Sequence, residues 1–470
     1  MIRHVRPRAL ALAALLVAAP LPFGSVAPGP SSMLLLATLA ALALTLWTPA
    51  SAAAPDSVER MPRELAIAAA ALTAIVVLGS LQSLPLPSAI TGFLAPETVR
   101  LAEQAHELAG SAPGRSAEEA GRRVAPSLAP AASRAAALDW LIPAAGFLAA
   151  ARLGSSRRVR RTLGGALLLA GGVQVTLGVV QWVSRSSTLW GVTLSAVGSR
   201  LRGSFVNPNH LALLLEIALV VAFAWVWWAV RRTVLGGVDG GRAEDRLLAV
   251  GPPAIVFLLL LGGLVLTGSR AALLSALAAM AVQGAVIGSR RGRKWLLVGG
   301  LAVGLVGVVA IAALGAEGTF SRLAASSVDE LGGGYRVEAA GATFDLFRRF
   351  PLAGSGLGSF QAAFPLVQPP TIPGFWRHAH ADWIEFLATT GLLGAALLGI
   401  GLFFYGKRLR QVVLHGERSE GRAAGLAALG ALVAVAIHSF ADFGLTIPAN
   451  ALALAVVAGA AGATRVAKQP

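Results

Sequence analysis

The sequence predicts an all-α polytopic membrane protein with about twelve transmembrane helices. Of the 470 residues, 56% are hydrophobic and only 13% are charged, whereas soluble domains contain about 25% charged residues. Apolar runs of about 20 residues, long enough to cross a bilayer, recur along the chain. Basic residues gather in short segments between these runs, as they do in the cytoplasmic loops of membrane proteins.

The predicted spans follow one another with few long interruptions. They cover residues 9–28, 31–50, 64–82, 135–152, 162–183, 209–230, 247–267, 270–288, 294–314, 381–405, 422–441 and 446–464. The bilayer takes the place of a soluble core, so chain length does not set the number of domains. We therefore expect residues 1–470 to form a single membrane domain.

The basic residues predict the orientation of the spans. With the amino terminus inside, 25 of the 39 Lys and Arg residues fall in inner segments, and ten of the others lie in two long outer loops. Long loops cross a membrane largely regardless of charge. Moving one span would place residues 157–161 or 290–294 outside. We therefore expect both termini in the cytoplasm.

The first apolar run also resembles a signal peptide, because basic residues precede Ala9 and small residues follow near Pro20. A second apolar run follows at once, which favours a retained first span and leaves cleavage open. The net charge of +16 does not indicate a nucleic-acid partner, because most basic residues lie in these topology-setting segments. The chain has no cysteine, which excludes disulfides and thiolate metal sites.

Two predicted outer loops are long enough to suggest a function. Residues 83–134 are rich in Ala, Pro and Glu and are expected to be partly helical. Residues 315–380 form the large periplasmic loop before the tenth span, and they contain a triple glycine at 332–334, a Pro-rich stretch and Trp376.

Unusual polar segments from distant parts of the chain are predicted to lie at one membrane surface, the outer one. They are residues 202–210, 267–270, 335–336, 378–382 and 438–442. Convergence of scattered titratable groups is typical of a functional site. Two carboxylates within predicted spans, Asp139 and Glu216, are expected to face the bundle interior.

Several of these residues also have a structural interpretation. Arg270 could extend to lipid headgroups from its helix end, and Asn207 and Asn209 could cap the sixth span. His438 and Asp442 lie one helical turn apart and could pair with each other.

A metal site is a further alternative. His378, His380, Asp382 and Glu385 offer ligands that suit zinc. Their spacing matches no familiar zinc motif, so we expect no metal and no other cofactor.

One motif resembles the O-antigen ligase and polymerase family. His380 and Ala381 are followed, after nine residues, by Gly391-Leu392-Leu393-Gly394, which is similar to that family's pattern of histidine, a small polar residue, nine positions and Gly-x-x-Gly. The sequence departs from the pattern at Ala381, where the family has Asn, Ser or Gln.

Further segments extend the resemblance over residues 160–460. The stretch 350–358 resembles the family's Pro-x-x-Gly-x-Gly turn, and residues 203–209, Ser269-Arg270 and 447–450 are also similar to family members.

The resemblance implies a GT-C-like, metal-independent, inverting glycosyltransferase of the bacterial inner membrane. Such an enzyme moves a glycan from an undecaprenyl diphosphate carrier to a hydroxyl of a lipid or glycan acceptor on the periplasmic side. His380 is then the candidate general base, because histidine titrates near neutral pH. Arg270 and Arg336 match family arginines and would bind the diphosphate, with Arg202 a weaker third candidate.

Supporting roles are expected for the polar residues around these four. Asp382 or Glu385 could stabilise the His380 imidazolium, and His378 could replace the missing polar group at position 381. The remaining supporting candidates are Asn207, Asn209, His438 and Asp442.

Other functions remain open at this stage. Members of the family also act as repeat-unit polymerases or as protein O-oligosaccharyltransferases. A lipid-linked glycan transporter or flippase belongs to a different class and would need polar groups through mid-membrane, where this sequence has few. A scaffold without catalysis would leave the Arg and His placement unexplained.

Overall fold

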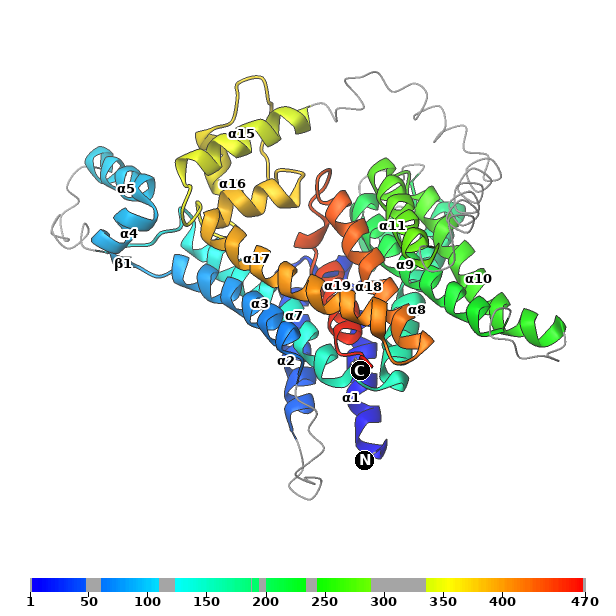
Figure 1. The fold of residues 1–470 in the computed structure, drawn as a ribbon. Helices are drawn as coiled ribbons and strands as arrows, with labels where there is room; N and C mark the ends of the chain where they lie inside the picture. Colours follow the sequence, from blue (N-terminus) through cyan, green and yellow to red (C-terminus); the bar gives the residue numbers. More distant parts are fainter. Residues whose placement is uncertain are drawn as a thin grey trace.

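The computed structural model describes residues 2–47, 61–109, 123–186, 188–193, 200–233, 243–288 and 335–467, which are mostly helical (Figure 1). The helices are α1 (Ile2–Ala18), α2 (Pro28–Leu46), α3 (Arg63–Gln82), α4 (Ser88–Leu94), α5 (Pro96–Ala109), α7 (Pro130–Leu153), α8 (Arg157–Ser184), α9 (Pro208–Thr233), α10 (Ala243–Leu266), α11 (Arg270–Gly288), α15 (Tyr335–Arg349), α16 (Phe360–Ala363), α17 (Asp382–His415), α18 (Ser419–His438) and α19 (Pro448–Gly462). Short 3-10 turns are η1 (Phe23–Ser25), η3 (Phe364–Leu366) and η4 (Gly444–Thr446). Two small antiparallel pairs join β1 (Leu86–Pro87) to β2 (Arg123–Val124) and β3 (Thr188–Leu189) to β4 (Val192–Thr193).

Eleven of the twelve predicted spans coincide with helices, and most of their ends agree to within a few residues. There are two larger differences: α17 continues ten residues past the predicted end, and α1 ends ten residues before it. Within the described part of the chain, nine helices are long and apolar enough to cross a membrane, and the apolar parts of α1 and α19 are shorter. The predicted span 294–314 lies outside the described residues, so the count of twelve stays a prediction. The prediction of a helical, multi-pass membrane protein is confirmed.

The predicted outer loops contain secondary structure of their own. Residues 83–134 include α4, α5 and the β1–β2 pair, and the described part of 315–380 includes α15, α16 and η3. A small core of Leu346, Phe350, Phe360 and Phe364 is buried beneath α15. Figure 1 shows α15 and α16 together above one end of the bundle, and both chain termini at the other end.

Helix α9 lies at the centre of the bundle. Its side chains from His210 to Ala222 are all buried, and it packs against α8, α10, α11 and α18. Small residues bring other helices close together, as expected where helices pack in a membrane: a side chain at Gly459 of α19 would meet the Phe147 carbonyl oxygen of α7 at 2.4 Å. Large apolar side chains point outward from the bundle, as for Val183 and Phe403, and give it a surface suited to lipid.

Helix α17 is broken at Gly391, the first glycine of the family's Gly-x-x-Gly pattern. Gly391 has φ 63°, and a side chain there would lie 2.3 Å from the Leu352 carbonyl oxygen. The turn at 351–357 satisfies the backbone groups that the break exposes. The amide of Leu392 donates to the Pro351 carbonyl at 2.8 Å, and the amide of Gly356 donates to the Thr389 carbonyl at 2.9 Å.

Buried Gln82 at the end of α3 joins the same turn. Its amide nitrogen donates to the Ala353 carbonyl at 2.5 Å, and its oxygen accepts from the amide of Leu357 at 2.9 Å. Buried backbone groups are costly to leave unpaired. The two glycine motifs of the sequence are therefore the two halves of one packed junction, which holds the outer half of α17 in place.

We expect Gly391→Ala to destabilise the protein by about 2 to 5 kcal/mol, because a left-handed backbone is unfavourable for alanine and its methyl group would overlap a carbonyl. Thermal unfolding of purified protein in detergent measures the loss. Gly399→Ala on the same helix is the matched control, since its added methyl group would meet nothing within 4 Å. Equal melting temperatures for the two variants would contradict this account of the junction.

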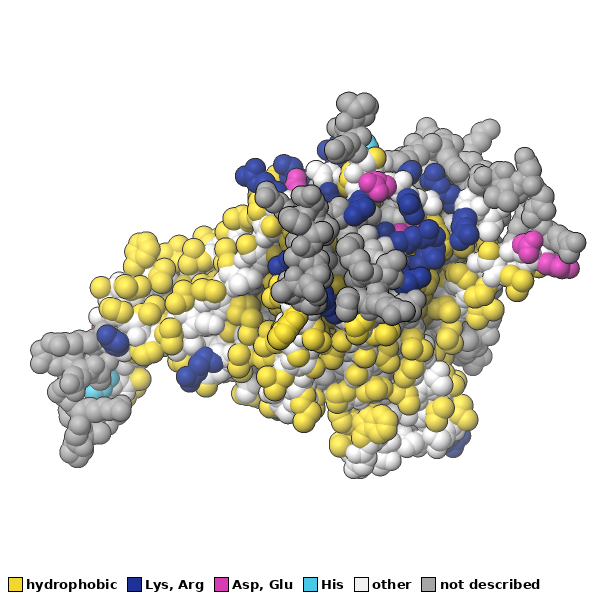
Figure 2. Space-filling model, turned by 90° about the horizontal axis from the view of Figure 1, so that it is seen from below, with side chains coloured by type: hydrophobic (Ala, Val, Ile, Leu, Met, Phe, Trp, Pro, Cys, Tyr) yellow, Lys and Arg dark blue, Asp and Glu magenta, His cyan; other side chains and the backbone are white. Residues whose placement is uncertain are grey.

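Basic side chains gather at the end of the bundle where the termini lie. Figure 2 shows them near the middle of that face, with apolar side chains around. Arg160 and Arg161 lie in the first two turns of α8, Arg231 and Arg232 in the last turn of α9, and Arg408 near the end of α17. This asymmetry of charge agrees with the positive-inside pattern in the sequence.

Candidate active site at one end of the bundle

Polar groups from five distant segments meet at the end of the bundle opposite the termini. The segments are the residues before and at the start of α9, the turn before α11, the start of α15, the residues before and at the start of α17, and the residues after α18. Direct contacts connect them, as described below. The sequence predicted only that these segments lie at the same end of the bundle. The contacts in the structure define which side chains meet there.

His380 lies directly before α17 in a left-handed backbone conformation, with φ 53°. Such a conformation is uncommon for residues other than glycine and clusters at functional sites. The Nδ1 atom is buried and lies 3.7 Å from Oδ1 of Asp442, while the side chain as a whole keeps 28% of its surface exposed. The rings of Trp376 and Phe443 flank the imidazole edge-on. The Nδ1 edge of His380 thus faces Asp442, while part of the side chain remains accessible.

Asp442 is the carboxylate that faces His380. It is buried, with 1% of its surface exposed. One oxygen accepts from the amide of Phe443 at 2.9 Å, and the other accepts from the side-chain amide of Asn209 at 2.6 Å. Burial alone would raise the pKa of Asp442, but His380 and the Phe443 amide outweigh it and hold this pKa well below its usual range. Asp442 is therefore an anion beside His380.

Arg200 extends this chain of contacts and was not predicted. Its Nη2 donates to the Asn209 side-chain oxygen at 2.6 Å, and its Nε donates to the Thr267 carbonyl at 2.6 Å. Thr267 belongs to the turn that precedes Arg270, the first residue of α11. Arg200 therefore connects the Arg270 turn to Asn209 and, through it, to Asp442.

Among the predicted phosphate-binding arginines, Arg336 contacts the segment that contains Asp442. It lies in the first turn of α15, and its Nη1 donates to the Ala441 carbonyl at 3.4 Å. Ala441 directly precedes Asp442. Arg202 lies beside Arg200 in a turn closed by the Phe205 amide, which donates to the Arg202 carbonyl at 3.0 Å.

The prediction that Asp382 or Glu385 supports the His380 imidazole is wrong for the described contacts. Asp382 accepts from the Ser439 hydroxyl at 2.9 Å and from the Leu445 amide at 3.2 Å. Glu385 instead pairs with His378, at 2.9 Å from its Nδ1. Both carboxylates thus have other partners, and Asp442 is the carboxylate that faces His380.

His378 packs behind the site, where it contacts Glu385 and Phe443. No contact among the described residues shows it in place of the polar group that is missing at position 381. Its ring stacks on Phe443 with the ring centres 4.2 Å apart, and buried Ala381 offers no polar group. Burial would lower the pKa of His378, but the hydrogen bond with Glu385 and its charge raise the pKa above the ordinary value.

The predicted pairing of His438 with Asp442 is also corrected. His438 Nδ1 pairs with Glu216 of α9, which also accepts from the Ser275 hydroxyl of α11 at 2.7 Å. Glu216 faces the bundle interior as predicted, and it is fully buried. Asp139 of α7 keeps more than a third of its surface exposed and contacts Ser31 of the neighbouring helix α2.

The two asparagines at the start of α9 have different roles. Asn207 caps the helix, because its side-chain oxygen accepts from the Asn209 amide at 2.9 Å. Asn209 points to Asp442 and Arg200 instead. A third asparagine, Asn450, is buried in α19 and donates to the His210 carbonyl at 3.0 Å and the Gly444 carbonyl at 3.2 Å. It ties the start of α9 to the segment after Asp442.

The considered metal ligands do not converge. His378 and Glu385 pair with each other, while Asp382 is directed to Ser439. In the described ranges, no group of three or more His, Asp and Glu residues is arranged to hold a metal ion.

These features define a multi-pass helical membrane protein with a histidine, a paired carboxylate and arginines gathered at one end of its bundle. Residues 255–399 match the family model described as O-antigen ligase. This part of the chain is therefore similar to the O-antigen ligase family, which confirms the resemblance seen in the motifs that it contains. No curated protein matches the chain.

The matched range contains Arg270, Arg336, His380 and the Gly391 junction. Asn209, Asp442 and Arg202 lie outside it, so the wider extent of 160–460 remains a prediction.

We expect Glu385→Gln to weaken the protein in a pH-dependent way. The folded-state pKa of His378 is raised above its unfolded value near 6.5, so the pair stabilises the fold below that value and its contribution disappears as pH rises through the folded-state pKa. The wild-type melting temperature should exceed that of the variant by about 2 °C at pH 6 and by less at pH 9.

Repeating the Glu385→Gln comparison in a His378→Gln background is the control, and there the difference should no longer vary with pH. A wild-type advantage that grows from pH 6 to pH 9 would contradict the assignment of the pair.

Proposed function

We propose that the protein is a membrane glycosyltransferase of the O-antigen ligase type. It transfers a glycan from an undecaprenyl diphosphate carrier to an acceptor hydroxyl on the periplasmic side of the bacterial inner membrane. The observation that carries this proposal is His380, held beside the Asp442 carboxylate, accessible to solvent and within the range matched by the family model.

In the proposed reaction, His380 acts as the general base. Its Nδ1 edge faces Asp442, so Nε2 is the atom that accepts the proton of the acceptor hydroxyl. The acceptor oxygen attacks the anomeric carbon as the bond from that carbon to the carrier diphosphate breaks, and the electron pair leaves with the diphosphate. One displacement of this kind inverts the anomeric configuration. Asp442 stabilises the imidazolium that forms.

The departing diphosphate carries the charge that arginines would stabilise. Guanidinium groups remain charged and form two parallel bonds to phosphate oxygens, so the reaction needs no metal ion. Arg336 is a candidate because it contacts the segment of Asp442 directly. Arg270 follows the turn held by Arg200, and Arg202 is the third candidate.

The proposed orientation follows from charge. The basic end of the bundle, with both termini, lies in the cytoplasm, and the His380 end lies in the periplasm. Lipid-linked glycans are then reached from the outer leaflet.

A repeat-unit polymerase would use the same residues, because it differs only in the acceptor. Deleting the gene in the native host distinguishes the two: long carrier-linked chains that are not attached indicate a ligase, and single repeat units indicate a polymerase. A transporter would move the carrier lipid across vesicles without glycosyl transfer.

We expect His380→Ala to lower glycan transfer by about 10² to 10⁴ without loss of protein from the membrane. A transfer assay with lipid-linked glycan and acceptor measures the effect. His106→Ala on α5, exposed and remote in sequence, is the control and should retain activity. Wild-type turnover in His380→Ala would remove this residue as the base.

We expect Arg336→Lys and Arg270→Lys each to reduce transfer about tenfold or more, because an ammonium group cannot form the paired bonds of a guanidinium. Arg348→Lys provides the matched control for α15, since Arg348 is 68% exposed and pairs with Asp345. If both lysine variants turn over normally, the diphosphate is bound by other residues.

We expect single cysteines at positions 375 and 417 to be labelled from opposite sides of the membrane. Phe375 is exposed near His380 and Glu417 is exposed at the basic end, and the chain has no natural cysteine. A membrane-impermeant maleimide added to intact spheroplasts should react with Phe375→Cys and not with Glu417→Cys. The reverse result would contradict the proposed orientation.

A further inference from the structure

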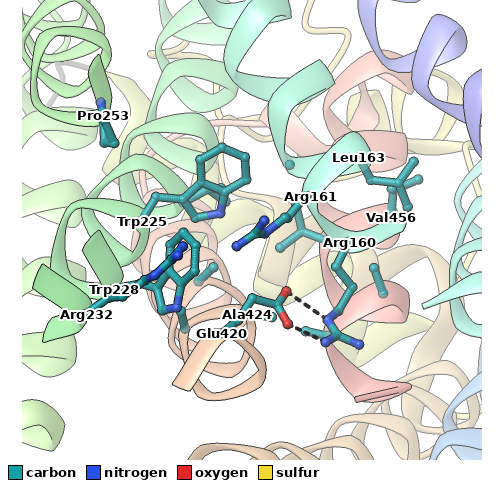
Figure 3. A pocket seen from close by; sticks show the side chains of 17 residues that line it. Arg160, Arg161, Leu163, Trp225, Trp228, Arg232, Pro253, Glu420, Ala424 and Val456 are labelled. Carbon is teal, nitrogen blue, oxygen red and sulfur yellow. Dashed lines mark hydrogen bonds and ion pairs between the residues drawn. The ribbon is translucent and has the colours of Figure 1, made fainter. Parts of the chain in front are cut away.

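A cavity of about 350 Å³ lies at the basic end of the bundle, far from His380. Helices α8, α9, α10, α18 and α19 all contribute to its wall (Figure 3). Helix α9 runs the length of the bundle with His210 at the candidate active site and Arg232 at this cavity. These two residues are separated by about 33 Å along the helix axis. The cavity is therefore unrelated to the proposed transfer site.

The cavity has more positive than negative charge. Glu420 is the sole carboxylate among the described residues that line the cavity. Arg160 donates two hydrogen bonds to this carboxylate, at 3.2 and 2.5 Å. Arg161 and Arg232 also line the cavity. Figure 3 shows Arg160 joined to Glu420 and the Arg161 guanidinium pointing toward two tryptophans. With three arginines and one carboxylate, the described lining of the cavity has an excess of two positive charges.

The Trp228 ring organises these cations. The guanidinium of Arg161 lies 4.5 Å from its centre, and those of Arg157 and Arg232 each lie 5.8 Å away. Stacking on the ring leaves the edges of a guanidinium available for hydrogen bonds. Two nitrogens of Arg161, Nε and Nη2, and the Nε of Arg157 are buried and have no hydrogen-bond partner. Unpaired donors of charged groups are costly in a buried place, and an anion would satisfy such groups.

The rest of the wall is apolar. Trp225, Leu163, Val221 and Val456 line it beside the arginines, together with Pro253 of α10. The guanidinium groups are suited to bind a phosphate, and the apolar wall is suited to contact a hydrocarbon chain. Tryptophan is also typical of the level at which lipid headgroups lie.

We propose that this cavity binds the phosphate of an anionic phospholipid from the leaflet opposite the candidate active site, with acyl chains along the apolar wall. Basic pockets between transmembrane helices recognise lipid headgroups in this way. Arg161 and Arg232 bind the phosphate, Trp228 positions both, and Arg160 remains bound to Glu420. The bound lipid joins α8, α9 and α18 at the end of the bundle that carries most of its positive charge.

The test uses purified full-length protein, extracted in detergent and exposed to equal amounts of phosphatidylglycerol and phosphatidylcholine. Native mass spectrometry counts the lipids that remain bound, and thermal unfolding measures their effect. Wild-type protein should retain phosphatidylglycerol and melt at a higher temperature in its presence. Arg161→Gln/Arg232→Gln should retain about tenfold to thirtyfold less of it. Arg158→Gln, an exposed arginine of α8 outside the cavity, should behave as wild type.

Equal retention by the wild type and the double variant would overturn the proposal. Glycerol 3-phosphate, which lacks acyl chains, should give no comparable stabilisation; if it protects as well as the lipid, the cavity binds a soluble anion and the lipid assignment fails. Should the double variant not fold, the wild type alone decides, because binding without preference for phosphatidylglycerol would equally overturn the proposal.

Discussion

The candidate active site depends on one buried carboxylate, Asp442. A buried anion is costly unless hydrogen bonds compensate it, and here the Phe443 amide and Asn209 donate them, while His380 lies beside the carboxylate. Because these partners come from the segment after α18, the start of α9 and the segment before α17, satisfying Asp442 fixes three helix ends relative to one another. Arg200 carries the same constraint to the turn before α11. The proposed chemistry needs the same arrangement, because it requires the His380 imidazole and the arginines at the same end of the bundle.

A second constraint fixes the position of His380. The break at Gly391 divides α17, and the turn at 351–357 supplies the hydrogen bonds that an unbroken helix would have made itself. The short outer part of α17 is thereby anchored to α3 through Gln82 and not only to the rest of its own helix. The rigid outer part places His380 and Glu385, while the longer inner part runs to the basic end, where the Arg161 and Trp228 cavity lies between neighbouring helices.

Eleven of the predicted spans could be recognised from sequence, because apolar length marks membrane helices, and the polar segments between them meet at one end of the bundle as expected. The His380 motif could be recognised as well. Contacts between side chains could not: Glu385 and Asp382 have the right spacing from His380, yet the rotation of α17 directs them to His378 and Ser439. His438 was expected to pair within its own helix end, but α9 presents Glu216 to it. Arg200 gave no signal, since its role depends on the conformation of an irregular segment. Gly391 and the turn at 351–357 were recognised separately, and only their packing explains both.

The central claim is that Asp442 acts on the reaction through His380. A double-mutant cycle in the glycan-transfer assay tests it most directly, with Asp442→Asn and His380→Ala made singly and together. We expect Asp442→Asn to lower turnover markedly in the wild-type background and to have little further effect once His380 is removed. If Asp442→Asn lowers turnover by the same factor in the His380→Ala background, the two residues act independently, and Asp442 does not act through His380.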